Sequence, residues 1–179
     1  MFYDKKNHGR SSFRTDDTPY RKKRQHKTKR WQNSDREFRC AHCKQMVFLT
    51  SDMGTVHRNH CPHCLHSLHV DTKPGNRASL CRARMEPVGL TCKHNGFDKY
   101  GRERGGDIMI VHLCTGCGTV NINRIAADDC CELILALFEQ SLIMDQRQRR
   151  LINEAGIRLL DSHDEELLHI ALFGKRWSP

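Results

Sequence analysis

The stretch of sequence that decides the fold is Cys40-Ala41-His42-Cys43, followed after seventeen residues by Cys61-Pro62-His63-Cys64. A CxxC turn directs two thiolates toward one metal ion, and two such turns complete a tetrahedral four-cysteine zinc site. Residues 46–50 between the pairs are expected to form a short strand and residues 51–54 a turn, which is the layout of a zinc ribbon. Redox-active dithiols are the alternative, although such proteins usually have a single CxxC beside a βαβ pattern. We therefore predict a zinc site made by Cys40, Cys43, Cys61 and Cys64.

A second zinc site is predicted around Cys114-Thr115-Gly116-Cys117. Alternating apolar residues predict strands on either side of this turn, at residues 107–113 and 119–125. A partner strand is expected at residues 85–91, and Cys81 at its head is the third cysteine ligand that the sequence offers. A closed structural zinc site needs four ligands, so one more must come from elsewhere.

The fourth ligand of the second site is left open by the sequence. The candidates are His69, His112, Cys92 and His94. His69 could return to the site through the loop at Pro74-Gly75. His112 lies two residues before Cys114 and so faces the same side of its strand. These two histidines are favoured equally over Cys92 and His94.

Five histidines, at positions 57, 60, 63, 66 and 69, lie within one short stretch. We expect His57, His63 and His66 to be polar surface residues. His60, directly before Cys61, is placed to donate a hydrogen bond to a thiolate sulfur and so tune the zinc site. An HNH-like nuclease, with His57, Asn59 and His60 around an open metal, is an alternative. It is disfavoured because these residues adjoin a closed all-cysteine site, so no catalytic activity is expected.

The chain of 179 residues carries a net charge of +9 and has a pI near 9.2. Residues 1–37 carry a net charge of +7 and residues 38–125 a net +6, whereas residues 126–179 carry a net −4. A basic balance favours an anionic partner, with nucleic acid the leading candidate. The chain starts with polar and basic residues, and no apolar run approaches the roughly 20 residues needed to span a bilayer. We therefore expect a cytoplasmic protein without a membrane segment, whose paired cysteines bind metal.

Residues 1–37 lack apolar periodicity and are expected to be a disordered basic tail when the chain is alone. The RNA-contacting candidates within it are Arg21, Lys22, Lys23, Arg24, Lys27, Lys29 and Arg30. Tyr20 and Trp31 flank this run and could stack on bases. A solvated tail that only aids solubility is the alternative. The folded part would present further cations, namely Arg39, Lys44, Arg58, Arg77, Arg82 and Arg84, with Arg58 and Arg77 singled out as RNA contacts.

The run Arg58-Asn59-His60-Cys61-Pro62-His63-Cys64-Leu65, with His69-Val70-Asp71 and Pro74-Gly75-Asn76-Arg77 after it, resembles the RNHCP domain family, named for its own motif. The resemblance continues through Cys81, Met85-Glu86-Pro87, the Cys114/Cys117 pair and Asn123-Arg124-Ile125-Ala126-Ala127-Asp128-Asp129. It implies a small, cysteine-rich bacterial protein without an established biochemical activity. Two positions depart from the implied pattern, which has glycine in place of Arg82 and aspartate in place of Asn76.

Residues 129–179 are expected to be helical. Asp129 with Glu132 resembles a capping box at the start of the first helix, and Gly156 and Gly174 predict the ends of two further helices. These helices are expected to pack on the zinc module or extend it, and a docking surface for a protein partner is the alternative. The resulting division is a tail at 1–37, a double zinc-knuckle module at 38–128 and helices at 129–179.

The predicted fold is a small α+β protein with zinc-ribbon-like β-hairpins, C-terminal helices and a disordered basic N-terminal tail. Two zinc ions are expected to take the place of a large hydrophobic core. The predicted function is non-catalytic RNA binding, with ribosomal RNA as the favoured partner. The alternative is a zinc-ribbon adapter that contacts DNA or a protein assembly such as the transcription machinery.

Overall fold

The computed structural model describes residues 37–49, 53–54, 58–73, 75–93, 96, 99–101 and 106–174. The predictions for the basic tail, for His57 and for His94 concern residues outside these ranges. The strands are β1 (Phe38–Arg39), β2 (Met46–Val47), β3 (Ser67–Leu68), β4 (Arg84–Lys93), β5 (Asp107–Cys114) and β6 (Val120–Arg124). The helices are α1 (Cys131–Leu142), α2 (Gln146–Glu154) and α3 (Glu165–Phe173), with a short 3₁₀ turn, η2 (Ser162–Asp164), before α3. The fold is therefore small α+β, as the sequence predicts.

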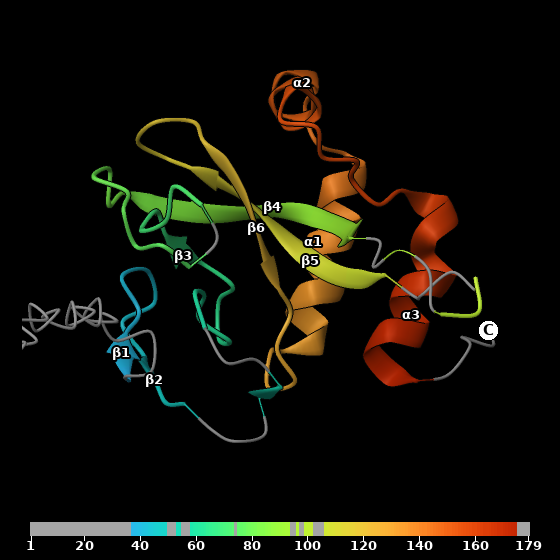
Figure 1. Cartoon of the computed structure of the whole chain (residues 1–179), viewed down its shortest axis with the longest axis horizontal. Coiled ribbons are helices and arrows are strands. Elements are labelled where there is room, and N and C mark those ends of the chain that lie inside the picture. The colour runs from blue at the N-terminus through green and yellow to red at the C-terminus, as the bar shows by residue number, and fades with distance from the viewer. Residues whose placement is uncertain are drawn as a thin grey trace, which may run out of the picture. The chain divides into compact units, whose positions relative to one another are not determined.

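A four-stranded antiparallel sheet with the order β3-β4-β5-β6 carries most of the described structure (Figure 1). The two long strands pair from Met85 with Cys114 to Lys93 with Asp107. β5 is rich in β-branched residues and is buried on both of its faces, because helices cover each side of the sheet. The Cys114–Cys117 turn joins β5 to β6, so the second cysteine pair sits at one end of the central hairpin.

β4 contains a proline, which a central strand tolerates only where a ladder hydrogen bond is missing. The register of β4 against β5 shifts between Pro87 and Gly89, which accommodates the missing N–H as a bulge. Gly89 then lies against the end of α1 and the segment that follows α2. A Cβ added there would be 2.9 Å from Leu159 Cδ2 and 3.1 Å from Ser141 Cβ, so glycine permits this close approach.

Two apolar clusters lie on opposite faces of the sheet. The larger one packs α1 and α3 against β4 and β5, and its buried members include Leu90, Ile110, Phe138 and Leu168. The smaller one centres on Val111 and joins Ile152 of α2 to Leu159. The expectation that zinc replaces a large core is therefore wrong for this part of the chain. No helix in the described ranges has both the length and the apolar character needed to cross a membrane.

The β1–β2 hairpin forms a separate two-stranded sheet, in which Phe38 pairs with Val47. Its strand at residues 46–47 is shorter than the predicted 46–50. The buried core of this hairpin consists of Cys40, Val47 and Cys61, so sulfur atoms supply most of it. Here, in contrast to the large sheet, the thiols do replace apolar side chains.

Candidate metal centres and an adjoining cleft

Three turns of the chain share one hydrogen-bonding pattern, and each begins at the first cysteine of a CxxC pair. In each turn the backbone N–H of that cysteine donates to the carbonyl five residues later. The N–H four residues after it donates back to the carbonyl of the same cysteine. The residue after the second cysteine is left-handed in all three, with φ of 64° at Lys44, 58° at Leu65 and 71° at Gly118. This geometry turns both sulfur atoms of a pair to one side, which is what shared metal ligation requires.

The first two turns bring four thiols together. The sulfur atoms of Cys40, Cys43, Cys61 and Cys64 all lie within 4.8 Å of one another. Cys40 Sγ is 3.6 Å from Cys64 Sγ, and Cys43 Sγ is 3.6 Å from Cys61 Sγ. Zinc–sulfur bonds of about 2.3 Å in a tetrahedron place two sulfur atoms about 3.8 Å apart, so these residues fit one zinc ion. The four cysteines that the sequence predicts as one site are thus in place.

The thiols of this first cluster differ in pKa because their surroundings differ. Burial raises the pKa of the Cys61 thiol well above its usual value and that of Cys64 to about 11. Burial also raises the pKa of Cys40, but hydrogen bonds from the backbone N–H groups of Cys43 and His42 outweigh it and bring that pKa to about 7. Because zinc binds thiolates, metal binding displaces protons from Cys61 and Cys64.

The second cluster consists of His69, Cys81, Cys114 and Cys117, whose ligand atoms also lie within 4.8 Å of one another. Cys81 Sγ is 3.6 Å from Cys114 Sγ, and Cys117 Sγ is 3.2 Å from His69 Nδ1. The chain returns to this site as the sequence allowed, since the His69 N–H donates to the Ala83 carbonyl across the intervening loop. Of the four candidates for the fourth ligand, the structure brings His69 to the cysteines. Together the two clusters can hold two metal ions and are consistent with two zinc sites.

His112, the other favoured candidate, is not part of the second cluster, so that prediction is wrong. Its side chain lies in the interior, and both ring nitrogens are engaged: Nε2 donates to the Leu65 carbonyl at 2.7 Å, and Nδ1 accepts from Asn123 Nδ2 at 3.1 Å. Burial lowers the pKa of His112 to about 3, so the ring is neutral. Cys92 is also remote from the cluster, because it pairs with Ile108 near the far end of β4.

The two clusters differ in their access to solvent. Cys40 and Cys61 are buried in the first, whereas Cys81 and Cys117 are exposed in the second. Hydrogen bonds from the side chain and the backbone of Thr119 lower the pKa of the Cys117 thiol to about 6, with Thr119 Oγ1 3.1 Å from the sulfur. This thiol is therefore already deprotonated near neutral pH and ready to bind metal.

Arg58, predicted as an RNA contact, is instead buried, with only 2% of the residue exposed. One guanidinium nitrogen forms an ion pair with Asp128, and another lies 3.5 Å from Asp129 Oδ1. A guanidinium enclosed between two carboxylates is not available to a phosphate. The prediction for Arg58 is therefore wrong, and we assign it a structural role.

His60 and Asp129 also have partners that the sequence analysis did not anticipate. His60 Nε2 lies 2.8 Å from Asp129 Oδ2, so His60 hydrogen bonds to a carboxylate and not, as predicted, to a thiolate. The same oxygen accepts the Ala126 N–H at 2.7 Å. Helix α1 starts after Cys130 without a side-chain cap, so the predicted capping box with Asp129 is wrong. Asp129 instead ties the segment before the second cysteine turn to the start of α1.

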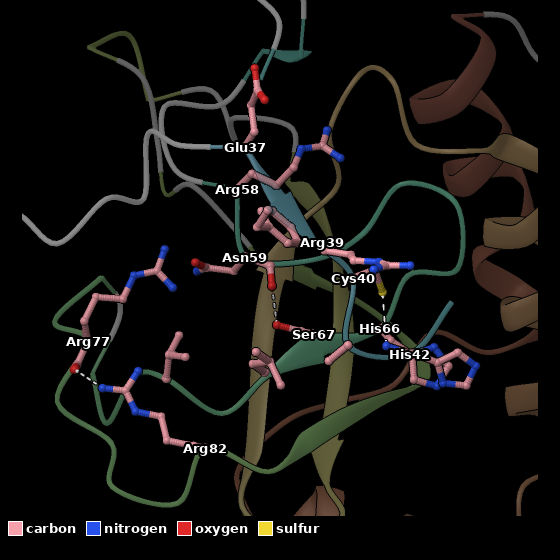
Figure 2. Close-up of a pocket in the computed structure, with 14 residues that line it drawn as sticks. Glu37, Arg39, Cys40, His42, Arg58, Asn59, His66, Ser67, Arg77 and Arg82 are labelled. Carbon is pink, nitrogen blue, oxygen red and sulfur yellow. Dashed lines mark hydrogen bonds between the residues drawn. The ribbon is translucent and has the colours of Figure 1, made fainter. Parts of the chain in front are cut away.

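A cleft of about 430 Å³ adjoins the first metal cluster (Figure 2). One wall is the segment from Glu37 to His42, which includes β1, and another is formed by β3 and its flanking residues. The cleft is lined by the cationic side chains of Arg39, Arg77 and Arg82, in addition to the paired Arg58. Glu37 is the one carboxylate among the described lining residues, so the arginines outnumber it and the cleft is strongly cationic.

Flat and apolar groups lie beside these cations. The rings of His42 and His66 are stacked, with their centroids 3.5 Å apart. Figure 2 shows this pair on one side of the cleft and Arg77 with Arg82 on the other. The apolar lining residues include Phe38, Leu68 and Val70. The cleft thus combines charge for an anion with surfaces against which a planar group can pack.

Two of the cleft arginines have a backbone conformation that side chains rarely adopt. Arg77 has φ of 50° and Arg82 has φ of 53°. Hydrogen bonds hold both positions, because the Arg77 N–H donates to Asp71 Oδ1 and the Arg82 N–H donates to the His69 carbonyl. The left-handed conformation costs a non-glycine residue about 1–2 kcal/mol. Strained residues of this kind are found preferentially at binding sites.

The family model that describes the RNHCP domain matches residues 35–135, which is more than half of the chain. The matched region contains both metal clusters, the cleft, and the Asp128-Asp129 pair that encloses Arg58. The resemblance seen in the sequence is therefore confirmed. Neither the curated proteins nor the solved structures provide a match.

Proposed function

The chain belongs to the RNHCP domain family, and we propose that this member is a non-catalytic, zinc-stabilised RNA-binding protein of the cytoplasm. Ribosomal RNA is the ligand to test first. The two metal clusters act as structural supports in this proposal, because each has four protein ligands and no position left for a substrate.

The cationic cleft is the observation that carries the proposal. Arg39, Arg77 and Arg82 line it within the folded part of the chain. Arginine is suited to phosphate because its planar guanidinium donates two parallel hydrogen bonds. The stacked imidazoles and the apolar lining add surfaces for unpaired bases, which is the mode by which single-stranded RNA is usually held.

The strain at Arg77 and Arg82 supports a binding role over a structural one. Neither guanidinium forms an ion pair with a carboxylate among the described contacts, and the Arg82 guanidinium has a long contact of 3.4 Å to the Arg77 carbonyl. Glycine, which the family resemblance implies at position 82, adopts this backbone conformation without strain. An arginine there costs stability, and phosphate binding would account for its presence.

This strain makes a clean test possible with Arg82→Gly. The variant removes the cation and relieves the backbone, so its free energy of unfolding should be unchanged or higher by up to about 1 kcal/mol. RNA affinity should fall, and the slope of log affinity against log salt should flatten by about 0.7 for each lost phosphate contact on a single strand. Fluorescence anisotropy with a labelled single-stranded ribosomal RNA fragment, at several salt concentrations, measures both.

Lys44→Gly is the matched control, because Lys44 has φ of 64° and an exposed cation but does not line the cleft. It should relieve comparable strain with a smaller loss of RNA affinity. Equal effects of the two variants would mean that the cleft has no special role. An unmodified protein that binds no RNA, or that cosediments with transcription complexes and not with ribosomes on a sucrose gradient, would favour the adapter function.

A further inference from the structure

A second cavity, also of about 430 Å³, lies along the edge strand β6 and has no role in the proposed function so far. Asn59 lines both this cavity and the cationic cleft, so the two adjoin at that residue. Its polar lining comes from His60, Asp71 and Asn123, among others, and its apolar lining includes Met109 and Ile122. The volume is within the range of about 300–1,000 Å³ that small-molecule sites occupy.

His60 also lines this cavity, and one of its ring nitrogens has no partner there. Its Nε2 lies 2.8 Å from a carboxylate oxygen of Asp129, which can only accept, so Nε2 carries a hydrogen. The other nitrogen, Nδ1, is buried and has no partner among the described residues. A buried polar atom of this kind normally has a partner, which points to a ligand that forms a hydrogen bond here.

The side-chain oxygen of Asn59 is a buried acceptor at the same cavity, and a chain of hydrogen bonds fixes its identity. The Leu65 carbonyl can only accept, so His112 Nε2 donates to it and His112 Nδ1 accepts from Asn123 Nδ2. The amide oxygen of Asn123 consequently faces Asn59, and Asn59 Nδ2 donates to it at 3.5 Å. This leaves Asn59 Oδ1, which is buried and has no partner among the described residues.

The carboxylate of Asp71 adds further acceptor capacity to the same lining. A ligand for this cavity must therefore present N–H donors, and Met109 and Ile122 provide apolar surface for a flat ring. The cations Lys73 and Arg124 also line the cavity, and Arg124 is paired with Asp107. The charge of Lys73 favours a ligand attached to phosphates over a cationic peptide, whose own charges it would repel.

We propose that this cavity binds an unpaired nucleobase that carries an exocyclic amino group, with Asn59 Oδ1 accepting from that group. The inference rests on the proposed RNA binding and adds base selectivity to it. The cleft would hold the phosphate backbone, and the adjoining cavity would read one base by its donors.

The first comparison uses two RNA strands that differ only in one exocyclic amino group. The zinc-loaded full-length chain is titrated with a labelled ten-nucleotide uridine strand that contains one adenosine, and with the same strand in which purine riboside, which lacks the amino group, replaces the adenosine. The adenosine strand should bind about tenfold more tightly, which corresponds to about 1.4 kcal/mol. Asn59→Leu should reduce this ratio to near one, while the exposed α2 variant Asn153→Leu should retain it.

The possible results separate the two proposals. Equal binding of the adenosine and purine strands would overturn the base-reading role but leave RNA binding intact. A ratio that persists in Asn59→Leu would also overturn it, because the amino group would then be read elsewhere. No binding of either strand would overturn both proposals. Preferential binding of an arginine-rich peptide would assign the cavity to a protein ligand and refute the nucleobase.

Discussion

Replacing Arg58 by methionine should destabilise the protein strongly, although no metal ligand is changed. The Arg58 side chain is fully buried and lies between Asp128, whose side chain is 34% exposed, and Asp129, whose side chain is fully buried. Methionine fills much of the same volume but removes the only arginine or lysine that the described structure places against Asp129. The carboxylate of Asp129 would then be buried without the arginine that is paired with it.

Breaking a buried ion pair by removing one partner typically costs 3–5 kcal/mol. We expect the lower half of this range, about 3–4 kcal/mol, because Asp129 keeps the hydrogen bonds from His60 and from the Ala126 N–H. With an m-value of about 2 kcal/mol per molar urea, the unfolding midpoint should fall by about 1.5–2 M. Urea unfolding followed by far-ultraviolet circular dichroism, with zinc in excess, measures this shift.

Two companion variants determine whether the buried charge is the cause. Arg39→Met removes an exposed arginine and should change stability by about 0.5 kcal/mol or less. Adding Asp129→Asn to Arg58→Met removes the stranded charge, so the double variant should be more stable than Arg58→Met alone. The reasoning would be refuted if the free energy of unfolding of Arg58→Met were within about 1 kcal/mol of the parent protein's. It would also be refuted if the double variant were less stable than Arg58→Met.

Elemental analysis should give two zinc equivalents per chain. A chelator should remove the ion of the second cluster first, because Cys81 and Cys117 are exposed. Cobalt spectra distinguish a four-sulfur site from a site with three sulfurs and one nitrogen, and loss of the first cluster's ion before the second's would contradict the expected order. Zinc affinity of the first cluster should fall roughly tenfold per pH unit for each displaced proton as the pH is lowered from 8 to 6.5, because the raised pKa of Cys64, about 11, keeps its thiol protonated there. Cys117, with its pKa lowered to about 6, should add little pH dependence in that window, so calorimetry in buffers of different ionisation enthalpy should show more protons released at the first cluster. Deleting residues 1–31 should flatten the slope of log RNA affinity against log salt by about 3, if roughly five of its cations contact phosphates; an unchanged slope would leave the cleft to account for RNA binding alone.

The metal ligands, the central strands and the helix ends could largely be predicted because they depend on local spacing in the sequence. The three CxxC pairs of this chain form the same local turn, so the first cluster and three ligands of the second followed directly from the sequence. The strands at 107–113 and 119–125 were predictable from alternation, and the observed β5 and β6 differ from them by one residue at most at each end. Gly156 and Gly174 have φ of 74° and 66° and follow α2 and α3, as expected of helix ends.

The predictions that failed depended on contacts between distant parts of the chain. His69 and His112 were indistinguishable by spacing, and only the packing of β5 against Leu65 showed that His112 points into the interior. Arg58 meets Asp128 seventy residues later in the sequence, and nothing local to Arg58 predicts burial. The adjacent acids Asp128 and Asp129 were the available sign that a buried cation needs partners here. A capping box at the start of α1 was the simpler interpretation of Asp129.

The small core of the β1–β2 hairpin has a consequence for how the protein would respond to its surroundings. Residues 37–42 form one wall of the cleft, and the buried centre of this hairpin is built mainly from the thiols of the first cluster. The large sheet and its helices have apolar cores of their own. Loss of zinc would therefore dismantle one wall of the cleft, the surface proposed to bind RNA, while most of the molecule stays folded. Restored zinc would rebuild that wall without new synthesis, so under the proposed function the occupancy of RNA would follow the zinc supply.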